Sequence, residues 1–410
     1  MNRKSRIAVA CFLALTLVAT LGLGCGDDEE EGKVTITVGH ITDMTGPASS
    51  AYRAVNFALE DVFEYVNQEE LIPGVNIKII TYDTGYNPAK DVPGYDWCID
   101  RGAEVIYAGL PSAGIYKPFA ERDKIPVVTL AVSKQMIDPP EWIFCMNAPV
   151  SYQMKAFLKW INEEHWDYDQ GIPKIGSVGW MQPYRIEIAE AISEYAEDHS
   201  GQFEVVDNIL VPTSVMTWAG EIEKLKGCDY VVIPTAGLDT VTFAKEFREK
   251  VGTAATFIGT DAIDAFQNLL VDAVGWEEMD GTLAAHGATR WWDEPYPIIE
   301  LAEELLHKYH ANEADDIIRA GIGYIGGFHQ AYGFFEVLQK AIGEVGAENF
   351  DAQAFYNAAI GLEVTWEGYE QWEFTPTKRY SWNYVGIYGW SEADQAVLRV
   401  VDEWVPNLVE

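Results

Sequence analysis

The stretch VTITVGHITDMTGPASSAYRAVNFALEDVFEYV, residues 34–66, decides the fold. Its first five residues alternate between apolar and polar side chains, which is the period of a β-strand. Its second half places Val55, Leu59, Val62 and Val66 at spacings of four, three and four, on one face of a helix. A strand, a loop and an amphipathic helix in this order predict the first unit of an α/β sheet.

The same order recurs along the chain. Further strands are predicted at residues 75–80, 105–108 and 126–131. After about residue 150 the pattern restarts, with strands at 175–180, 205–211, 230–233, 256–259 and 283–286 and helices around 154–160, 187–195 and 218–225. Strands that alternate with helices predict parallel sheets covered on both faces. We therefore expect two doubly wound α/β units of similar plan.

The last part of the chain has a different pattern. Residues 298–310, 327–342 and 352–360 read as helices. The aromatic-rich segment 366–390 reads as antiparallel strands.

The first residues are typical of an export signal. Arg3, Lys4 and Arg6 precede an apolar run that ends at Leu23, and Gly24 is followed by Cys25 and an acidic stretch. We expect a signal peptide over residues 1–24, and a lipidated Cys25 that begins an acidic tether over residues 25–33. The chain would then be extracytoplasmic and tied to the membrane by lipid alone. Plain secretion remains an alternative, because Gly22 stands where lipidation sites usually have a large aliphatic residue. A membrane-spanning anchor is less favoured, since the run is at the lower limit of roughly 17–25 residues.

The charge balance excludes some partners. The formal net charge is −36, with 64 acidic and 28 basic residues. Phosphate binding needs clustered lysine and arginine, so we expect no nucleic-acid partner. An anionic lipid surface is disfavoured for the same reason.

Three cysteines follow Cys25 in the sequence, and they lie far apart. Cys98, Cys145 and Cys228 allow one disulfide at most, and their spacing indicates neither a metal site nor a redox motif. We expect small buried side chains.

Five motifs occur in order along the chain. They are HITDMTGP (40–47) with Tyr52 after it, YDTGYNPAK (82–90), GLPSAG (109–114), QPYR (182–185), and GCDYVV (227–232) followed by IGTD (258–261). Together they resemble the leucine/isoleucine/valine-binding family of periplasmic binding proteins (type I fold), the receptors of ABC importers. The resemblance runs across nearly the whole chain after the signal.

The resemblance implies two lobes joined by three crossings, with the ligand between them. The crossings would lie near residues 149–152, 287–292 and 363–372. The first lobe would comprise residues 34–149 and 290–365, and the second lobe residues 150–289 and 366–410.

The resemblance also assigns candidate ligand-binding residues. Ser112 and Ser133, with Ala131 beside the latter, would bind a ligand carboxylate through hydroxyls and backbone N–H groups at helix starts. The alternative is that each serine only caps a helix.

The remaining candidates surround the other end of the ligand. Asp261 would receive an ammonium group, although its side chain is one methylene shorter than the glutamate of leucine-type receptors. Tyr52 and Tyr184 would cap the site from each lobe, and Thr235 would line the second lobe. A solvated or capping role is the alternative for Asp261. The pair Trp291 and Trp292, next to a predicted crossing, could close the pocket, but such a pair more often packs a hinge.

Three other patterns indicate chemistry only weakly. Residues 83–85 form the Asp-Thr-Gly triplet of aspartic proteases, but no second triplet exists to complete the dyad. Residues 321–326, GIGYIG, fit a dinucleotide fingerprint, but a helical pattern precedes them where a strand is needed. His307 and His310 with Glu303 could share a metal, yet exposed histidines on an acidic helix are more often solvated. We expect no enzyme, no metal and no cofactor.

The favoured hypothesis is therefore a transport receptor that closes on a small solute and delivers it to a membrane permease. A sensor of the same fold that feeds a signalling protein is the second hypothesis, and an enzyme that uses the cleft is the third. The ligand could be an amino acid, an amide or an aromatic carboxylate. Trp180 beside Tyr184 slightly favours an aromatic or large apolar group.

Overall fold

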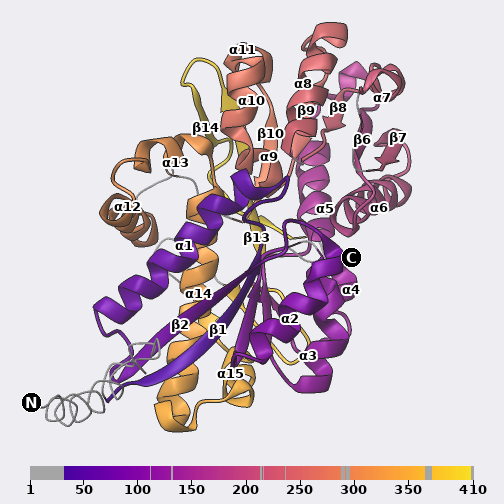
Figure 1. Cartoon of the computed structure of the whole chain (residues 1–410). Helices are drawn as coiled ribbons and strands as arrows, with labels where there is room; N and C mark the ends of the chain where they lie inside the picture. Colours follow the sequence, from indigo (N-terminus) through magenta and orange to yellow (C-terminus); the bar gives the residue numbers. More distant parts are fainter. Residues whose placement is uncertain are drawn as a thin grey trace, which may run out of the picture.

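Two α/β lobes form the structure, a computed structural model that describes residues 32–110, 112–130, 133–212, 215, 217–235, 237–287, 291, 296–364 and 372–407. Figure 1 shows one lobe, which contains β1 and β2, below the other, which contains β6 to β10. The predicted signal peptide, Cys25, most of the tether and Ala131 lie outside the described residues.

The first lobe is built on a parallel sheet with the strand order β2-β1-β3-β4-β5. The strands are β1 (Val34–Thr42), β2 (Val75–Asp83), β3 (Val105–Ala108), β4 (Val127–Thr129) and β5 (Ile143–Cys145). The helices are α1 (Ser49–Gln68), α2 (Asp91–Ile99), α3 (Lys117–Asp123), α4 (Lys134–Ile137), α12 (Pro297–Tyr309), α13 (Ala314–Ala320), α14 (Gly323–Val345) and α15 (Ala352–Ala359). The three helices predicted from residue 298 onward therefore form, and α14 and α15 cover this sheet (Figure 1).

Both faces of this sheet are buried. Val38 and Tyr107 pack in one core with Phe334 of α14, while Ile106 packs in a second core with Cys98 of α2 and Ala120 of α3. Alternating side chains of the strands thus serve two helix layers, as expected of a doubly wound sheet.

Gly323 of the GIGYIG motif and Gly327 just after it bring α14 close to α1. A Cβ atom on Gly327 would lie 2.9 Å from Cα of Val55, and one on Gly323 would lie 3.1 Å from Cβ of Ala54. The contact at Gly327 is too short for a larger residue and the one at Gly323 is tight, so both glycines serve helix packing. The element before the motif is the helix α13, as predicted.

The second lobe has a mixed sheet with the order β14-β13-β10-β9-β8-β6-β7. Its strands are β6 (Lys174–Trp180), β7 (Glu204–Val211), β8 (Tyr230–Val232), β9 (Thr256–Gly259), β10 (Leu283–His286), β13 (Tyr384–Ser391) and β14 (Ala396–Arg399), with β15 (Val405–Pro406) beside β13. The strands β6 to β10 are parallel, and β13 and β14 are antiparallel, as the aromatic-rich segment predicts. The helices include α5 (Val150–Trp160), α6 (Pro183–Asp198), α7 (Ala219–Leu225), α8 (Gly237–Val251), α9 (Asp261–Ala265), α10 (Gln267–Val274) and α11 (Trp276–Met279).

The last lobe boundary differs from the predicted one. Phe374 and Trp382 pack in the core of the first lobe, and the backbone N–H of Cys145 donates to the carbonyl of Arg379. Within the described residues the chain therefore joins the second sheet at β13, well after residue 366. Short β11 (Glu363–Val364) and β12 (Trp372–Glu373) form a ribbon before it. The other lobe boundaries stay predictions.

The cysteines agree with the expectation of small buried side chains. Cys98, Cys145 and Cys228 are free and buried, and burial raises the pKa of each thiol to about 12. No disulfide joins these three residues.

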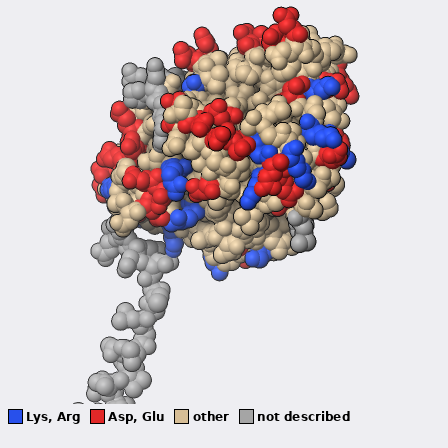
Figure 2. Space-filling model, turned by 90° about the horizontal axis from the view of Figure 1, so that it is seen from above, with Lys and Arg blue, Asp and Glu red and all other residues tan. Residues whose placement is uncertain are grey.

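The charged side chains of the described surface are mixed in sign. Figure 2 shows acidic side chains spread over one face, with lysine and arginine in smaller groups among them. Within the described part of the chain, no helix is long and apolar enough to cross a membrane.

Candidate binding site between the lobes

A cavity of about 170 Å³ lies between the two lobes. Parallel strands of both sheets end beside it: Gly109 follows β3, Asn147 follows β5, Tyr184 follows β6 and Asp261 follows β9. The carboxyl ends of strands are where open α/β sheets bind ligands. The cavity is slightly larger than one of about 150 Å³ that holds a benzene ring.

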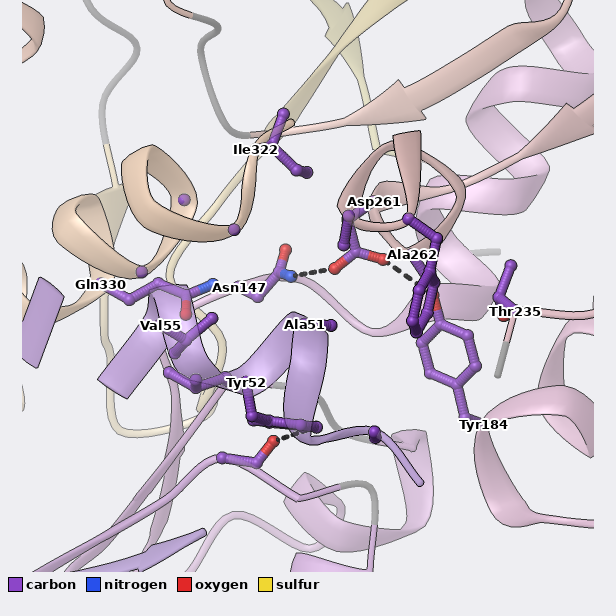
Figure 3. A pocket seen from close by; sticks show the side chains of 18 of the residues that line it. Ala51, Tyr52, Val55, Asn147, Tyr184, Thr235, Asp261, Ala262, Ile322 and Gln330 are labelled. Carbon is purple, nitrogen blue, oxygen red and sulfur yellow. Dashed lines mark hydrogen bonds between the residues drawn. The ribbon is translucent and has the colours of Figure 1, made fainter. Parts of the chain in front are cut away.

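Asp261 is the polar centre of the site (Figure 3). The Tyr184 hydroxyl lies 2.6 Å from Oγ1 of Thr260 and donates to Oδ1 of Asp261 at 2.7 Å. Because the tyrosine has one proton, Thr260 donates to Tyr184 in this arrangement. Burial, and then the nearby Asp261 charge, raise the pKa of Tyr184, so it remains a donor at neutral pH.

Asn147 reaches Asp261 from the other lobe. Its Nδ2 donates to Oδ2 of Asp261 at 3.1 Å (Figure 3). Its Oδ1 accepts from the N–H of Ala148 at 2.8 Å and from Nε2 of Gln153 at 3.2 Å. These two donors fix the amide orientation, so the Asn147 amine faces Asp261. A single carboxylate is thus hydrogen-bonded by both lobes.

Tyr52 and Tyr86 add polar edges to a mostly apolar cavity. The Tyr52 hydroxyl donates to the carbonyl of Gly109 at 2.8 Å, and burial followed by the nearby Tyr86 and Asp261 raise its pKa. The Tyr86 hydroxyl donates to Oε1 of Gln182 at 3.2 Å, which forms a second polar contact between the lobes.

Apolar groups supply most of the remaining wall. They come from both lobes: Ala51, Val55, Leu130, Trp180, Ala262, Ala265, Phe266, Ile322 and Trp382, with the glycines of α14. Such a wall fits the apolar part of a small ligand, with a few polar groups to orient it.

The cavity brings together four of the predicted residues. Tyr52, Tyr184, Thr235 and Asp261 line it. Ala131 is not described, although its neighbour Leu130 lines the cavity.

The two predicted serines are not among the lining residues. Ser112 lies beside the buried Asp91, and burial raises the pKa of that carboxyl. Ser133 occupies the N-cap position of α4. Both positions fit the capping and packing alternative, and their roles toward a ligand stay predictions.

Of the tryptophan pair, only Trp291 lies within the described residues. Trp291 stacks on Tyr324 with ring centroids 5.9 Å apart, and its Nε1 donates to the carbonyl of Gly321. This packing agrees with the hinge alternative for Trp291, and Trp292 lies outside the described residues.

Sequence reasoning missed several lining residues. Asn147, Gln330 and Trp382 carry no motif that marks them. Asn147 could have been found, because it stands just before the predicted first crossing, where a polar side chain can face both lobes. Arg185 belongs to the QPYR motif, but the motif alone predicts no ligand-binding role for it.

The residues of the protease-like triplet and of the candidate metal cluster have structural contacts. Burial alone would raise the pKa of Asp83, but hydrogen bonds from the Thr45 hydroxyl and the N–H groups of Met44 and Gly85 lower it. This carboxylate therefore orders a loop. His310 Nε2 lies 3.0 Å from Asp61. Among the described residues, no three His, Cys, Asp or Glu side chains could hold a metal ion.

A family model described as periplasmic binding protein matches residues 35–379. The chain belongs to this family of periplasmic binding proteins. The family binds ligands and is not enzymatic, which confirms that reading of the sequence. No curated protein matches the chain in sequence.

Solved structures confirm the type I periplasmic binding protein fold. One is a branched-chain amino acid ABC transporter protein from Thermus thermophilus with bound valine, with a TM-score of 0.79, 20% identity, and coverage of 92% of this chain and 97% of that one. Another is a solute-binding protein from Rhodopseudomonas palustris HaA2 with p-hydroxybenzoic acid (TM-score 0.74, 19% identity, coverage 91% and 97%). A third is a fatty acid ABC transporter substrate-binding protein from Thermomonospora curvata (TM-score 0.75, 18% identity, coverage 91% and 95%).

Proposed function

We propose that the protein is the extracytoplasmic solute-binding receptor of an ABC importer. It takes a small amino-acid-like or carboxylate ligand between its lobes and presents the closed complex to a membrane permease. The observation that carries this proposal is the Asp261 carboxylate, which accepts hydrogen bonds from Tyr184 of one lobe and Asn147 of the other. A ligand bound there contacts both lobes and so favours their closure.

Binding of such a ligand requires no covalent chemistry. The cavity buries the apolar part of the ligand, and the polar groups around Asp261 orient the rest. A micromolar dissociation constant corresponds to only about −8 kcal/mol.

Carboxylic acids are the favoured ligand class. The similar structures named above bind valine and p-hydroxybenzoic acid, or carry the name of a fatty acid transporter, and all of these ligands have a carboxyl group. Branched-chain amino acids and small aromatic acids both match the cavity in size. An α-amino group would add to Asp261 as a third hydrogen-bond partner, since a carboxylate has about four acceptor positions.

We also propose that Cys25 carries the lipid that holds the receptor at the membrane. The small residue before it and the acidic residues after it support this assignment. A Cys25→Ala variant expressed with its own signal should appear in the soluble extracytoplasmic fraction. Equal membrane retention of the variant and the natural protein would contradict the lipid anchor.

A thermal-shift screen of the part that begins after Cys25 tests the receptor function. The panel holds amino acids, aromatic and aliphatic carboxylates, their amides, and urea. A ligand present at 100 times its dissociation constant adds about 2.7 kcal/mol to the free energy of unfolding, which raises Tm measurably. We expect stabilisation by members of one chemical class. If the whole panel leaves Tm unchanged, a small-solute receptor of this kind is contradicted.

A further inference from the structure

Arg185 is a buried cation in the wall of the cavity. Its side chain is 6% exposed, and it begins on α6 next to Tyr184. It crosses β6 at Gly179, where a Cβ atom would lie 2.4 Å from Nε of Arg185. Nη2 then donates to the carbonyl of Val178 at 2.6 Å and to that of Val232 at 3.3 Å. The guanidinium thus lies at the carboxyl ends of two parallel strands, β6 and β8.

Arg185 has no counter-charge within the part of the chain that the structure describes. No carboxylate there forms an ion pair with it, and its Nε finds no hydrogen-bond partner there. Burial lowers its pKa to about 10, so it stays protonated at neutral pH. A buried charge without a counter-charge is costly, and the cost falls when an anion arrives.

Arg248 shows what a purely structural buried arginine looks like in the same lobe. It is 7% exposed, and its donors go to the carbonyls of Glu278, Gly252 and Ala255 at 2.7, 2.9 and 2.9 Å. Its guanidinium also lies 3.7 Å from the centre of the Phe257 ring. Arg248 does not line the cavity. An unpaired Nε and a place in the cavity wall therefore distinguish Arg185.

We propose that Arg185 binds the carboxylate of the ligand, and that the site selects carboxylates over the corresponding amides. This inference rests on the proposed receptor function. A guanidinium has five N–H donors, and the two on Nη2 of Arg185 are used by carbonyls, so Nη1 and Nε are the donors left for a carboxylate. Asp261 repels a second carboxylate, so the acid group lies at Arg185 and the ligand's opposite end faces Asp261. A zwitterionic amino acid satisfies both residues, whereas Ser112 and Ser133 are not needed for the acid group.

Matched pairs of acids and amides test the assignment. The probes are benzoate with benzamide, 4-hydroxybenzoate with 4-hydroxybenzamide, isovalerate with isovaleramide, and valine with valinamide. Tm shifts identify the binding probes, and calorimetry gives their affinities. We expect each binding acid to exceed its amide by at least tenfold. Arg185→Gln should remove most of that preference by weakening the acid alone, and Arg185→Lys should restore part of it.

Arg248→Gln is the control for the loss of a buried arginine. It should lower Tm but leave the acid affinity within twofold of the natural protein. If Arg185→Gln is too unstable to measure, the acid and amide affinities of the natural protein still decide the question.

The outcomes separate the two proposals. Amides that bind as well as their acids, or an Arg185→Gln variant that keeps the full preference, overturn the role of Arg185 and leave the receptor function standing. Binding by no acid and no amide overturns both.

Discussion

Replacing Gly237 with alanine should obstruct closure of the lobes. Gly237 begins α8 in the second lobe, and a Cβ atom on it would lie 2.8 Å from the carbonyl oxygen of Pro47 in the first lobe. Ordinary carbon–oxygen contacts are about 3.3–3.6 Å, so the lobes would have to separate here by roughly half an ångström. The oxygen belongs to the backbone and cannot rotate away.

The expected loss of affinity follows from the size of this clash. Overpacking by one methyl group costs about 1–3 kcal/mol. The cost falls on the closed state alone, because open lobes do not meet at this point. At about 1.4 kcal/mol for each factor of ten, ligand affinity should fall roughly 5- to 150-fold.

Gly252→Ala separates this effect from backbone strain. Gly237 and Gly252 both have positive φ, +54° and +72°, and no atom lies within 4 Å of a Cβ placed on Gly252. An alanine in this left-handed backbone conformation lowers the free energy of unfolding by about 1–2 kcal/mol at either position. This loss is the same whether the lobes are open or closed. Both variants should therefore lose similar stability, and only Gly237→Ala should lose affinity. Calorimetry with the tightest-binding probe acid measures the difference. Equal affinities for the two variants would refute the closure argument.

Three further predictions follow from the site and the cores. Asp261→Ala should abolish calorimetric binding of any amino-acid ligand, and unchanged affinity would rule out its ammonium role. Gly327→Ala should destabilise the fold by about 1–3 kcal/mol in denaturant unfolding, because its Cβ would meet Val55 at 2.9 Å; Gly343→Ala on the same helix meets no atom and should gain about 0.5–1 kcal/mol. A thiol reagent at neutral pH should label the three buried cysteines, Cys98, Cys145 and Cys228, only after unfolding. Rapid labelling of these residues in the folded protein would contradict their burial.

The alternation of strand and helix patterns was sufficient to predict the fold. Residues 34–66 show both periods clearly, and β1 and α1 form where they indicate. β5 (Ile143–Cys145) was missed although it lies in an apolar run, residues 142–146, of the kind that predicted the equally short β4 and β8. The boundary at residue 366 was placed too early because a pattern identifies a strand but not its partner sheet. Phe374 and Trp382 are equally apolar whichever lobe they pack in.

The strand ends located the site in the sequence, but they did not decide which nearby side chains face the cavity. Asp261 lies two residues beyond the end of β9 and Tyr184 four residues beyond the end of β6, and both line the cavity. Ser112 and Ser133 lie just as far beyond β3 and β4, four residues, yet neither is among the lining residues. Within those loops the chain can turn the hydroxyl toward the ligand or toward its own helix, and sequence spacing does not distinguish the two.

Asn147 connects the two lobes, and it explains how binding couples to closure. It belongs to the first lobe, yet its amine is used by Asp261 of the second. Ala148 and Gln153 hold its amide in one orientation, so the contact forms only when the lobes reach the correct separation. A ligand that enters between Arg185 and Asp261 neutralises a buried cation beside this same contact. The polar groups that recognise the ligand and the polar groups that join the lobes are therefore shared, and a change in either should alter both binding and closure.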